Sequence, residues 1–147
     1  MESVENLLTK LINLELNEGV TPLELASNIH SDDYSEVKIK KKFNQIYCHV
    51  FFQDKEMFGD EIITLEQIYV YDSKFKLQEI QLKNKKNMQT LWCRQLEIKE
   101  ILYQISDLCI QNKDISMLQK ILNNLPETII KIAEETFEQS LVGMARA

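Results

Sequence analysis

The sequence predicts a small α+β protein that is mostly helical. Apolar residues recur at helical spacing in the first and last thirds of the chain, and the middle holds short runs of β-forming residues. We expect an N-terminal helical pair, a small antiparallel β-hairpin or sheet, and a C-terminal helical hairpin. At 147 residues this is one domain, 1–147, with an N-terminal helical part (1–57), a β-rich part (58–87) and C-terminal helices (88–143).

The first two expected helices have clear start signals. The first helix, 3–18, carries a stripe of leucines after Ser3, which is a good N-cap residue, and Gly19 follows as a C′ candidate. The second helix begins at Thr21, which is followed by a proline at the first helical position and by Glu24 three residues after the cap. This is the spacing of a capping box.

The segment 37–53 fits two patterns. A helix that opens near Asp33 would carry one apolar stripe at spacings i, i+4, i+7, i+8 and i+11, formed by Ile39, Phe43, Ile46, Tyr47 and Val50. The alternative is a strand, because Val37, Ile39 and Phe43 also occupy odd positions and "IYCHVFF" is dense in β-formers. We favour a helix to about Tyr47 and leave the rest open.

Turn-forming residues organise the rest of the chain. "EMFGDE" around Gly59 predicts a turn, and "IYVYDSKFKLQEIQL" predicts a β-hairpin that turns at residues 72–74. The run "KNKKN", 83–87, predicts a polar linker. Three helices should follow: a long one at about 88–111 with a stripe from Leu91 to Cys109, a short one after Asp114, and a last one from Pro126 to Gly143.

Charge is unevenly distributed along the chain. The net charge is −6, which argues against non-specific adhesion to anionic polymers or lipids. Residues 1–37 carry a balance of −7, residues 38–99 a balance of +4, and residues 100–147 a balance of −3. A basic middle between two acidic ends gives the molecule a polar face.

The sequence indicates a reducing compartment. The start "MESVENLL" has neither the basic region nor the apolar region of a signal peptide, and no apolar run approaches the roughly 18 residues of a membrane span. The chain has three cysteines, Cys48, Cys93 and Cys109, which is an odd number, and they lie far apart in the sequence. We therefore expect free thiols, with Cys109 buried in the long C-terminal helix. We therefore predict a cytoplasmic protein without a membrane partner. Its richness in Lys, Ile, Asn and Glu suits a low-GC genome, bacterial or phage.

Signals of catalysis are nearly absent. The three glycines form no phosphate-binding loop, and there is no nucleophile elbow. Cys48 and His49 are adjacent, which points their side chains apart on a strand and does not pair a nucleophile with a base. His30 and the cysteines show no closely spaced ligand pair for zinc. The sequence predicts no enzyme, no cofactor and no metal site.

Two functions fit these observations. The first is a small acidic protein-interaction module (adaptor, inhibitor, immunity or chaperone-like protein) that binds another protein. A partner with a basic surface would match its acidity. The long helical stripe with its flanking side chains also predicts a homodimer on the C-terminal helices. The candidate interface residues are Trp92, Leu96 and Tyr103.

The alternative is a nucleic-acid-binding regulator of the helix-turn-helix or winged-helix type. On a third helix the lysines at 38, 41 and 42 would share one face, and the lysines at 83, 85 and 86 could add phosphate contacts. The net acidity, the acids at the turn and the lack of a nearby arginine weigh against it. Its candidate residues are Lys38, Lys41, Lys42, Lys83, Lys85 and Lys86.

Overall fold

The fold is α+β, with a larger sheet than the sequence predicted. The computed structural model describes residues 3–30, 34–55 and 62–146. Within these ranges the chain forms five α-helices, one short 3-10 helix and one five-stranded antiparallel sheet. The predicted class was right about α+β, but the prediction of only a small hairpin or sheet was wrong, because the sheet runs from Tyr34 to Cys93.

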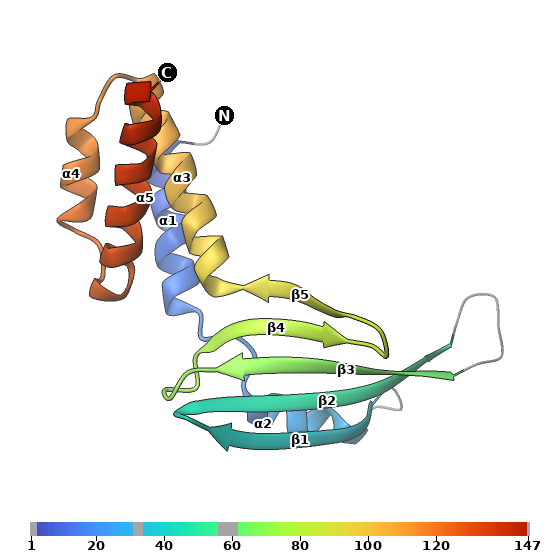
Figure 1. The fold of residues 1–147 in the computed structure, drawn as a ribbon. Helices are drawn as coiled ribbons and strands as arrows, with labels where there is room; N and C mark the ends of the chain where they lie inside the picture. The colour runs from blue at the N-terminus through green and yellow to red at the C-terminus, as the bar shows by residue number, and fades with distance from the viewer. Residues whose placement is uncertain (1–2, 31–33, 56–61, 147) are drawn as a thin grey trace. The chain divides into compact units, whose positions relative to one another are not determined.

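The elements fall into two compact units (Figure 1). A helical unit comprises Met1–Asn17 and Gln95–Ala147, and a sheet unit comprises Glu18–Arg94. In chain order the elements are α1 (Val4–Leu16), α2 (Pro22–Ser27), η1 (Asn28–His30), β1 (Tyr34–Lys42), β2 (Gln45–Lys55), β3 (Ile62–Tyr71), β4 (Leu77–Lys83), β5 (Met88–Cys93), α3 (Arg94–Gln111), α4 (Ser116–Leu122) and α5 (Glu127–Arg146).

The helical unit forms its core from α1, α3, α4 and α5. The predicted cap of the first helix is confirmed, since the Ser3 side chain accepts a hydrogen bond from the Asn6 amide. Burial of the apolar stripes stabilises the unit, because isolated helices of this length are marginal in water. The buried residues of this core are Leu7, Leu11, Ile98, Leu102, Ile105, Cys109, Leu118, Ile121, Ile129, Ala133 and Phe137.

Three helix boundaries differ from the predictions. The first helix ends at Leu16, three residues before Gly19. The predicted long helix at 88–111 begins only at Arg94, because the preceding residues form β5. The last helix does not stop at Gly143 but continues through it to Arg146. The burial of Cys109 within α3 is confirmed.

The sheet unit is a meander in the order β1-β2-β3-β4-β5, and every neighbouring pair is antiparallel (Figure 1). Its core lies on the face that packs against Leu25 of α2. The predicted start of this helix is confirmed, since the Thr21 side chain accepts a hydrogen bond from the Glu24 amide. The buried residues of this face are Leu25, Ile46, Cys48, Val50, Tyr69, Tyr71 and Leu77.

The helix favoured for residues up to Tyr47 is wrong. Residues Tyr34–Lys42 and Gln45–Lys55 are two strands, joined by the two-residue turn Phe43-Asn44. Both turn residues have positive φ, 50° and 65°, which is the geometry of a type I′ hairpin turn. The strand alternative therefore holds for the described part of this segment.

The hairpin predicted around residues 72–74 is confirmed as β3 and β4. The Asp72 carboxylate accepts hydrogen bonds from the amides of Lys74 and Lys76, which fixes the turn. The predicted polar linker at 83–87 is instead a second tight turn, in which the Asn84 side chain accepts from the two amides at 86 and 87. It returns the chain into β5, the fifth strand.

Two sequence predictions fall outside the described residues. These are the turn around Gly59 and the helix start at Asp33. In the described ranges, no helix combines the length and the apolar character that crossing a membrane requires.

Candidate binding surfaces

The outer face of the sheet, opposite α2, joins a basic row to an aromatic row. Alternation along β1 places Lys38 and Lys40 on this face, where they lie across from His49 and Tyr47 of β2. Phe51 continues the second row at the other end of β2. Cross-strand neighbours on one face lie about 5 Å apart at Cβ, so the two rows form one surface.

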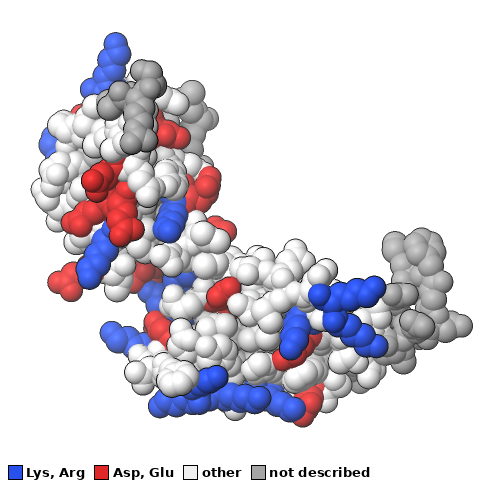
Figure 2. All heavy atoms as spheres, in the orientation of Figure 1, with Lys and Arg blue, Asp and Glu red and all other residues white. Residues whose placement is uncertain are grey.

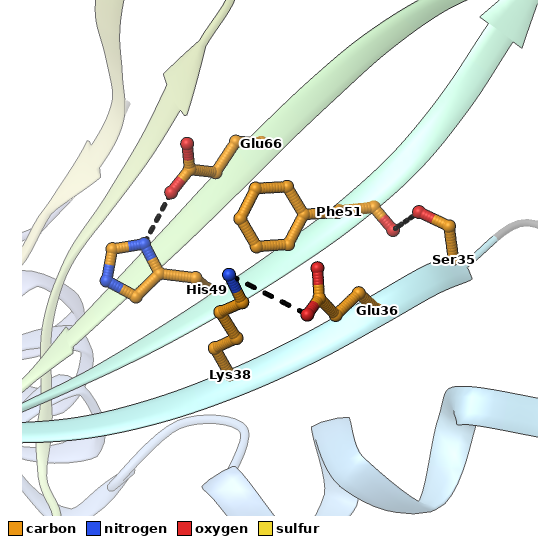
Figure 3. A network of polar contacts seen from close by, with 6 residues as sticks. All are labelled: Ser35, Glu36, Lys38, His49, Phe51 and Glu66. Atoms are coloured by element: carbon orange, nitrogen blue, oxygen red, sulfur yellow. Dashed lines mark hydrogen bonds and ion pairs between the residues drawn. The ribbon is translucent and has the colours of Figure 1, made fainter.

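Part of this outer face is neutralised by its own acids (Figure 3). The Lys38 ammonium lies 3.7 Å from the Glu36 carboxylate and 5.3 Å from the centre of the Phe51 ring. His49 makes a short hydrogen bond through Nδ1 to the Glu66 carboxylate on β3. Lys38 and His49 are therefore already held by partners of this chain.

The turn end of β1 keeps its positive charge on both faces of the sheet: Lys40 and Lys42 lie on the outer face, and Lys41, which pairs with Ile46, lies on the α2 face. Lys40, Lys41, Lys42, Tyr47 and His49 line an open hollow of about 680 Å³. In the described part of the chain, no carboxylate lies within ion-pair distance of Lys40 or Lys41. The Lys42 ammonium lies 5.6 Å from the ring centre of the neighbouring Phe43. The hollow is thus a basic site with an aromatic wall.

Phe43 occupies an unusual backbone position. A bulky residue with φ of 50° is an outlier, because type I′ turns favour Asn, Asp or Gly at this place. Its side chain is 88% exposed, so packing does not offset the strain. Residues held in such conformations concentrate at functional sites.

The lysines proposed for nucleic acid do not form one surface. Lys38, Lys41 and Lys42 lie on β1, so the recognition helix required by the helix-turn-helix alternative is a strand. The lysines at 83, 85 and 86 lie at the end of β4 and in the turn after it. Lys83 is level with Glu66 of β3 and, across β2, with Glu36 of β1. Figure 2 shows the two groups apart, one along β1 and one at the opposite corner of the sheet.

The helical unit offers a different surface, which we call the α3/α5 face. Tyr103 donates a hydrogen bond of 2.6 Å to the Gln139 side chain and so connects α3 to α5. Leu96 lies two turns before Tyr103 on the same side of α3 and is 61% exposed. A hollow of about 500 Å³ extends along α5 from Gln139, lined also by Glu135, Glu138, Val142 and Gly143.

Trp92 does not belong to this α3/α5 face. It lies on β5 and packs against the core of the sheet unit. The Arg94 guanidinium lies 5.3 Å from its ring centre and donates a hydrogen bond to the Leu77 carbonyl. The predicted set of Trp92, Leu96 and Tyr103 is therefore split between the two units.

Among the described residues, the fold does not pair the adjacent Cys48 and His49. Cys48 and His49 point to opposite faces of β2, and burial raises the pKa of the Cys48 thiol to about 11, which disfavours a thiolate. No three His, Cys, Asp or Glu side chains among the described residues lie close enough together to hold a metal ion.

Sequence reasoning missed several residues of these surfaces. His49 and Glu66 are 17 positions apart, and only the register of β2 and β3 brings them together. Lys40, Phe43 and Tyr47 were available as a basic and aromatic cluster, but the helical interpretation assigned Phe43 and Tyr47 to an apolar stripe that packs on the core. Alternation of lysine and apolar residues along β1 was the signal that could have identified them.

Comparison of the chain with protein-family models, with curated proteins and with solved structures gives no match.

Proposed function

We propose that this chain is a non-catalytic protein-interaction module, of the adaptor, inhibitor, immunity or chaperone-like kind. The observation that carries the proposal is the α3/α5 face, where exposed Leu96 and Tyr103 share one side of α3 and Tyr103 bonds Gln139. Gln139 lines a hollow together with two exposed glutamates, Glu135 and Glu138. Interfaces commonly combine an apolar or aromatic centre with a polar rim. Tyrosine is favoured in such centres because its ring packs and its hydroxyl stays hydrogen-bonded.

The charge of the helical unit indicates the partner. Its segments contain six basic and eleven acidic residues, a balance of −5. Complementary charge accelerates encounter and selects partners. The partner we propose is therefore a protein with a basic surface around an apolar pocket. The three free cysteines fit a reducing compartment such as the cytoplasm.

A homodimer through the same face is our second proposal. Leu96 and Tyr103 of one copy would meet those of the other across a two-fold axis. Such pairing brings two acidic rims together, so salt should strengthen it, whereas salt should weaken binding to a basic protein. Sedimentation at micromolar concentration, with and without added salt, distinguishes the two.

The experiment is a comparison of two double variants in extracts of cells that carry the sequence. Leu96→Ser with Tyr103→Ser alters the α3/α5 face, and Leu23→Ser with Ile29→Ser is a control of similar exposure in the sheet unit. We expect a specific protein to be retained by the wild type and the control and lost by the first variant. The purified partner should then bind Glu135→Gln with Glu138→Gln more weakly, mainly at low salt. Equal retention by all variants would contradict the proposal.

A further inference from the structure

The end of the sheet that holds the β1–β2 turn also holds the β3–β4 turn. In an antiparallel meander these two turns lie at the same end of the sheet, and the pairing of Ile46 with Tyr71 places them side by side. Each turn carries an exposed phenylalanine with positive φ: Phe43, described above, and Phe75, with φ of 63° and 52% exposure. Lysines precede both rings in the sequence.

We propose that this basic turn end binds single-stranded nucleic acid. Lys40 and Lys42, which share the outer face with Tyr47, would contact phosphates, and Lys41 between them would add positive charge from the edge of β1. Phe43 and Tyr47 would stack on bases. This surface belongs to the sheet unit and is separate from the α3/α5 face of the proposed function. It also differs from the recognition helix that the sequence predicted as an alternative, because strands and turns form it.

Charge is the first argument for a nucleic acid at this basic turn end. Lysines 40, 41 and 42 surround a hollow of about 680 Å³, and the first two have no acidic partner within ion-pair distance in the described ranges. Phosphates along a nucleic-acid backbone present negative charge at regular intervals, which suits a row of lysines. Lysine acts as a point charge on phosphate and carries little sequence information, so the binding should depend weakly on base sequence.

The aromatic rings argue for single strands. Exposed rings stack on bases only where the bases are splayed out, as in single strands and loops. Phe43 is held outward by a turn that other residues would occupy with less strain. An acidic protein partner would use the lysines but would give this exposed ring no comparable role. The combination of rings and lysines therefore favours a single strand over a duplex or an acidic protein.

The lysines have a competing structural explanation. β1 is an edge strand, and lysines on such strands prevent pairing with other chains. That explanation accounts for charge along β1, but it accounts neither for Phe43 at the turn nor for the aromatic row on β2. The experiment below separates the two explanations, because edge protection predicts no affinity for nucleic acid.

Binding is measured by fluorescence anisotropy of the full chain with labelled single-stranded DNA and RNA of about 15 nucleotides. Lys40→Gln, Lys41→Gln and Lys42→Gln are combined in one variant. The matched control combines Lys83→Gln, Lys85→Gln and Lys86→Gln, which removes the same charge at the opposite corner. We expect the first variant to lose about tenfold or more in affinity and its salt slope to fall by about 2. The control should change affinity less than about threefold by the same reasoning.

A second variant, Phe43→Gly, tests the ring independently of folding. Glycine adopts positive φ without strain, so the variant should raise the melting temperature of the protein. If the ring stacks on a base, affinity for single strands should nevertheless fall about fivefold or more. A more stable variant with weaker binding cannot be explained by damage to the fold.

Four outcomes would overturn the proposal. These are no binding by the wild type, equal losses in the two lysine variants, unchanged affinity of Phe43→Gly, and competition by polyglutamate as strong as that by the oligonucleotide. The last result would identify an acidic protein as the occupant. Weaker binding of a duplex of the same length is the expected companion result.

Discussion

The hydroxyl of Tyr71 donates a hydrogen bond to the main-chain carbonyl of Val20, 51 positions earlier in the chain. Tyr71 lies at the end of β3 and is completely buried, and Val20 precedes α2. Leu77, the partner of Tyr71 on β4, donates a second hydrogen bond from its amide to the Glu18 carbonyl. These two bonds fix the segment that leads into α2 against the ends of β3 and β4, which is where the core of the sheet unit begins.

Tyr71→Phe should destabilise the sheet unit by about 1 kcal/mol, because the variant leaves the Val20 carbonyl without this donor. Chemical denaturation checks it, with fluorescence of Trp92, which packs on this core and is the single tryptophan of the chain. Tyr47→Phe is the matched control. The Tyr47 hydroxyl bonds an exposed glutamine side chain, so its loss should change stability by less than about 0.5 kcal/mol. Equal effects of the two variants would contradict this role of the Tyr71 hydrogen bond.

Gly19→Ala should destabilise the protein more than the addition of one methyl group suggests. Gly19 has φ of 85°, and a Cβ there would lie 2.7 Å from the Cβ of Leu77. Both the backbone strain and the contact oppose the substitution, so we expect a loss of about 1–3 kcal/mol in the free energy of unfolding.

The matched control for this substitution is Gly143→Ala in α5. A Cβ at that position meets no atom within 4 Å, and the position is helical. Alanine there should raise helix stability by about 0.5–1 kcal/mol. The two substitutions should thus change the unfolding free energy in opposite directions, and the same sign for both would contradict the geometry at Gly19.

The fold could be predicted from sequence where local signals are strong. Ser3 and Thr21 cap the helices that the sequence assigned to them, and the turn at Asp72 was correctly placed. The prediction failed for β1 and β2, since Ile39, Phe43 and Val50 match a helical stripe by coincidence.

The physical reason for this failure is the turn. Ile39 and Val50 belong to two strands that alternate independently, and the two residues of the turn shift the core-facing positions from odd numbers in β1 to even numbers in β2. The Phe43-Asn44 turn lacks the glycine that normally marks type I′ geometry. Tertiary pairing in the sheet, rather than local propensity, decides this segment.

The candidate surfaces were less predictable than the fold. Leu96 and Tyr103 share a helix, so their spacing alone placed them on one face. The basic turn end depends on the register of three strands, which a single sequence does not specify. The Tyr103–Gln139 bond likewise joins two helices 36 positions apart.

Ser106→Ala should stabilise the helical unit by about 1 kcal/mol. The Ser106 side chain is fully buried in α3, and within the described residues its hydroxyl has no hydrogen-bond partner. Removing an unsatisfied polar group relieves its desolvation cost, and alanine also has the higher helix propensity. Thermal denaturation followed by circular dichroism measures the change.

Thr136→Val provides the comparison for Ser106→Ala. The Thr136 hydroxyl is also buried, but it donates to the Ile132 carbonyl at 2.7 Å. Its removal should be neutral or cost up to about 1 kcal/mol, because a satisfied bond is lost. A loss of stability in Ser106→Ala would mean that its hydroxyl is satisfied in solution.

Alkaline pH should destabilise the sheet unit. Burial raises the pKa of the Cys48 thiol from 9.0 to about 11. The pKa values of Tyr69 and Tyr71 are also raised, chiefly by burial. The unfolded chain therefore loses these protons at lower pH than the folded chain does. The stabilisation is complete below about pH 9 and is lost as the pH rises through about 11.

Denaturant unfolding between neutral pH and about pH 11, with a reductant present, tests this linkage. For Cys48 alone the loss at pH 11 should be about 2 kcal/mol, since each pKa unit corresponds to about 1.4 kcal/mol. Cys48→Ala should flatten the pH dependence but keep the contribution of the two tyrosines. Cys93→Ala, at a half-buried cysteine on β5, should retain the wild-type slope. An unfolding free energy that stays constant over this range would show that the Cys48 thiol is open to water, and the packing of β2 against α2 would then be looser than described.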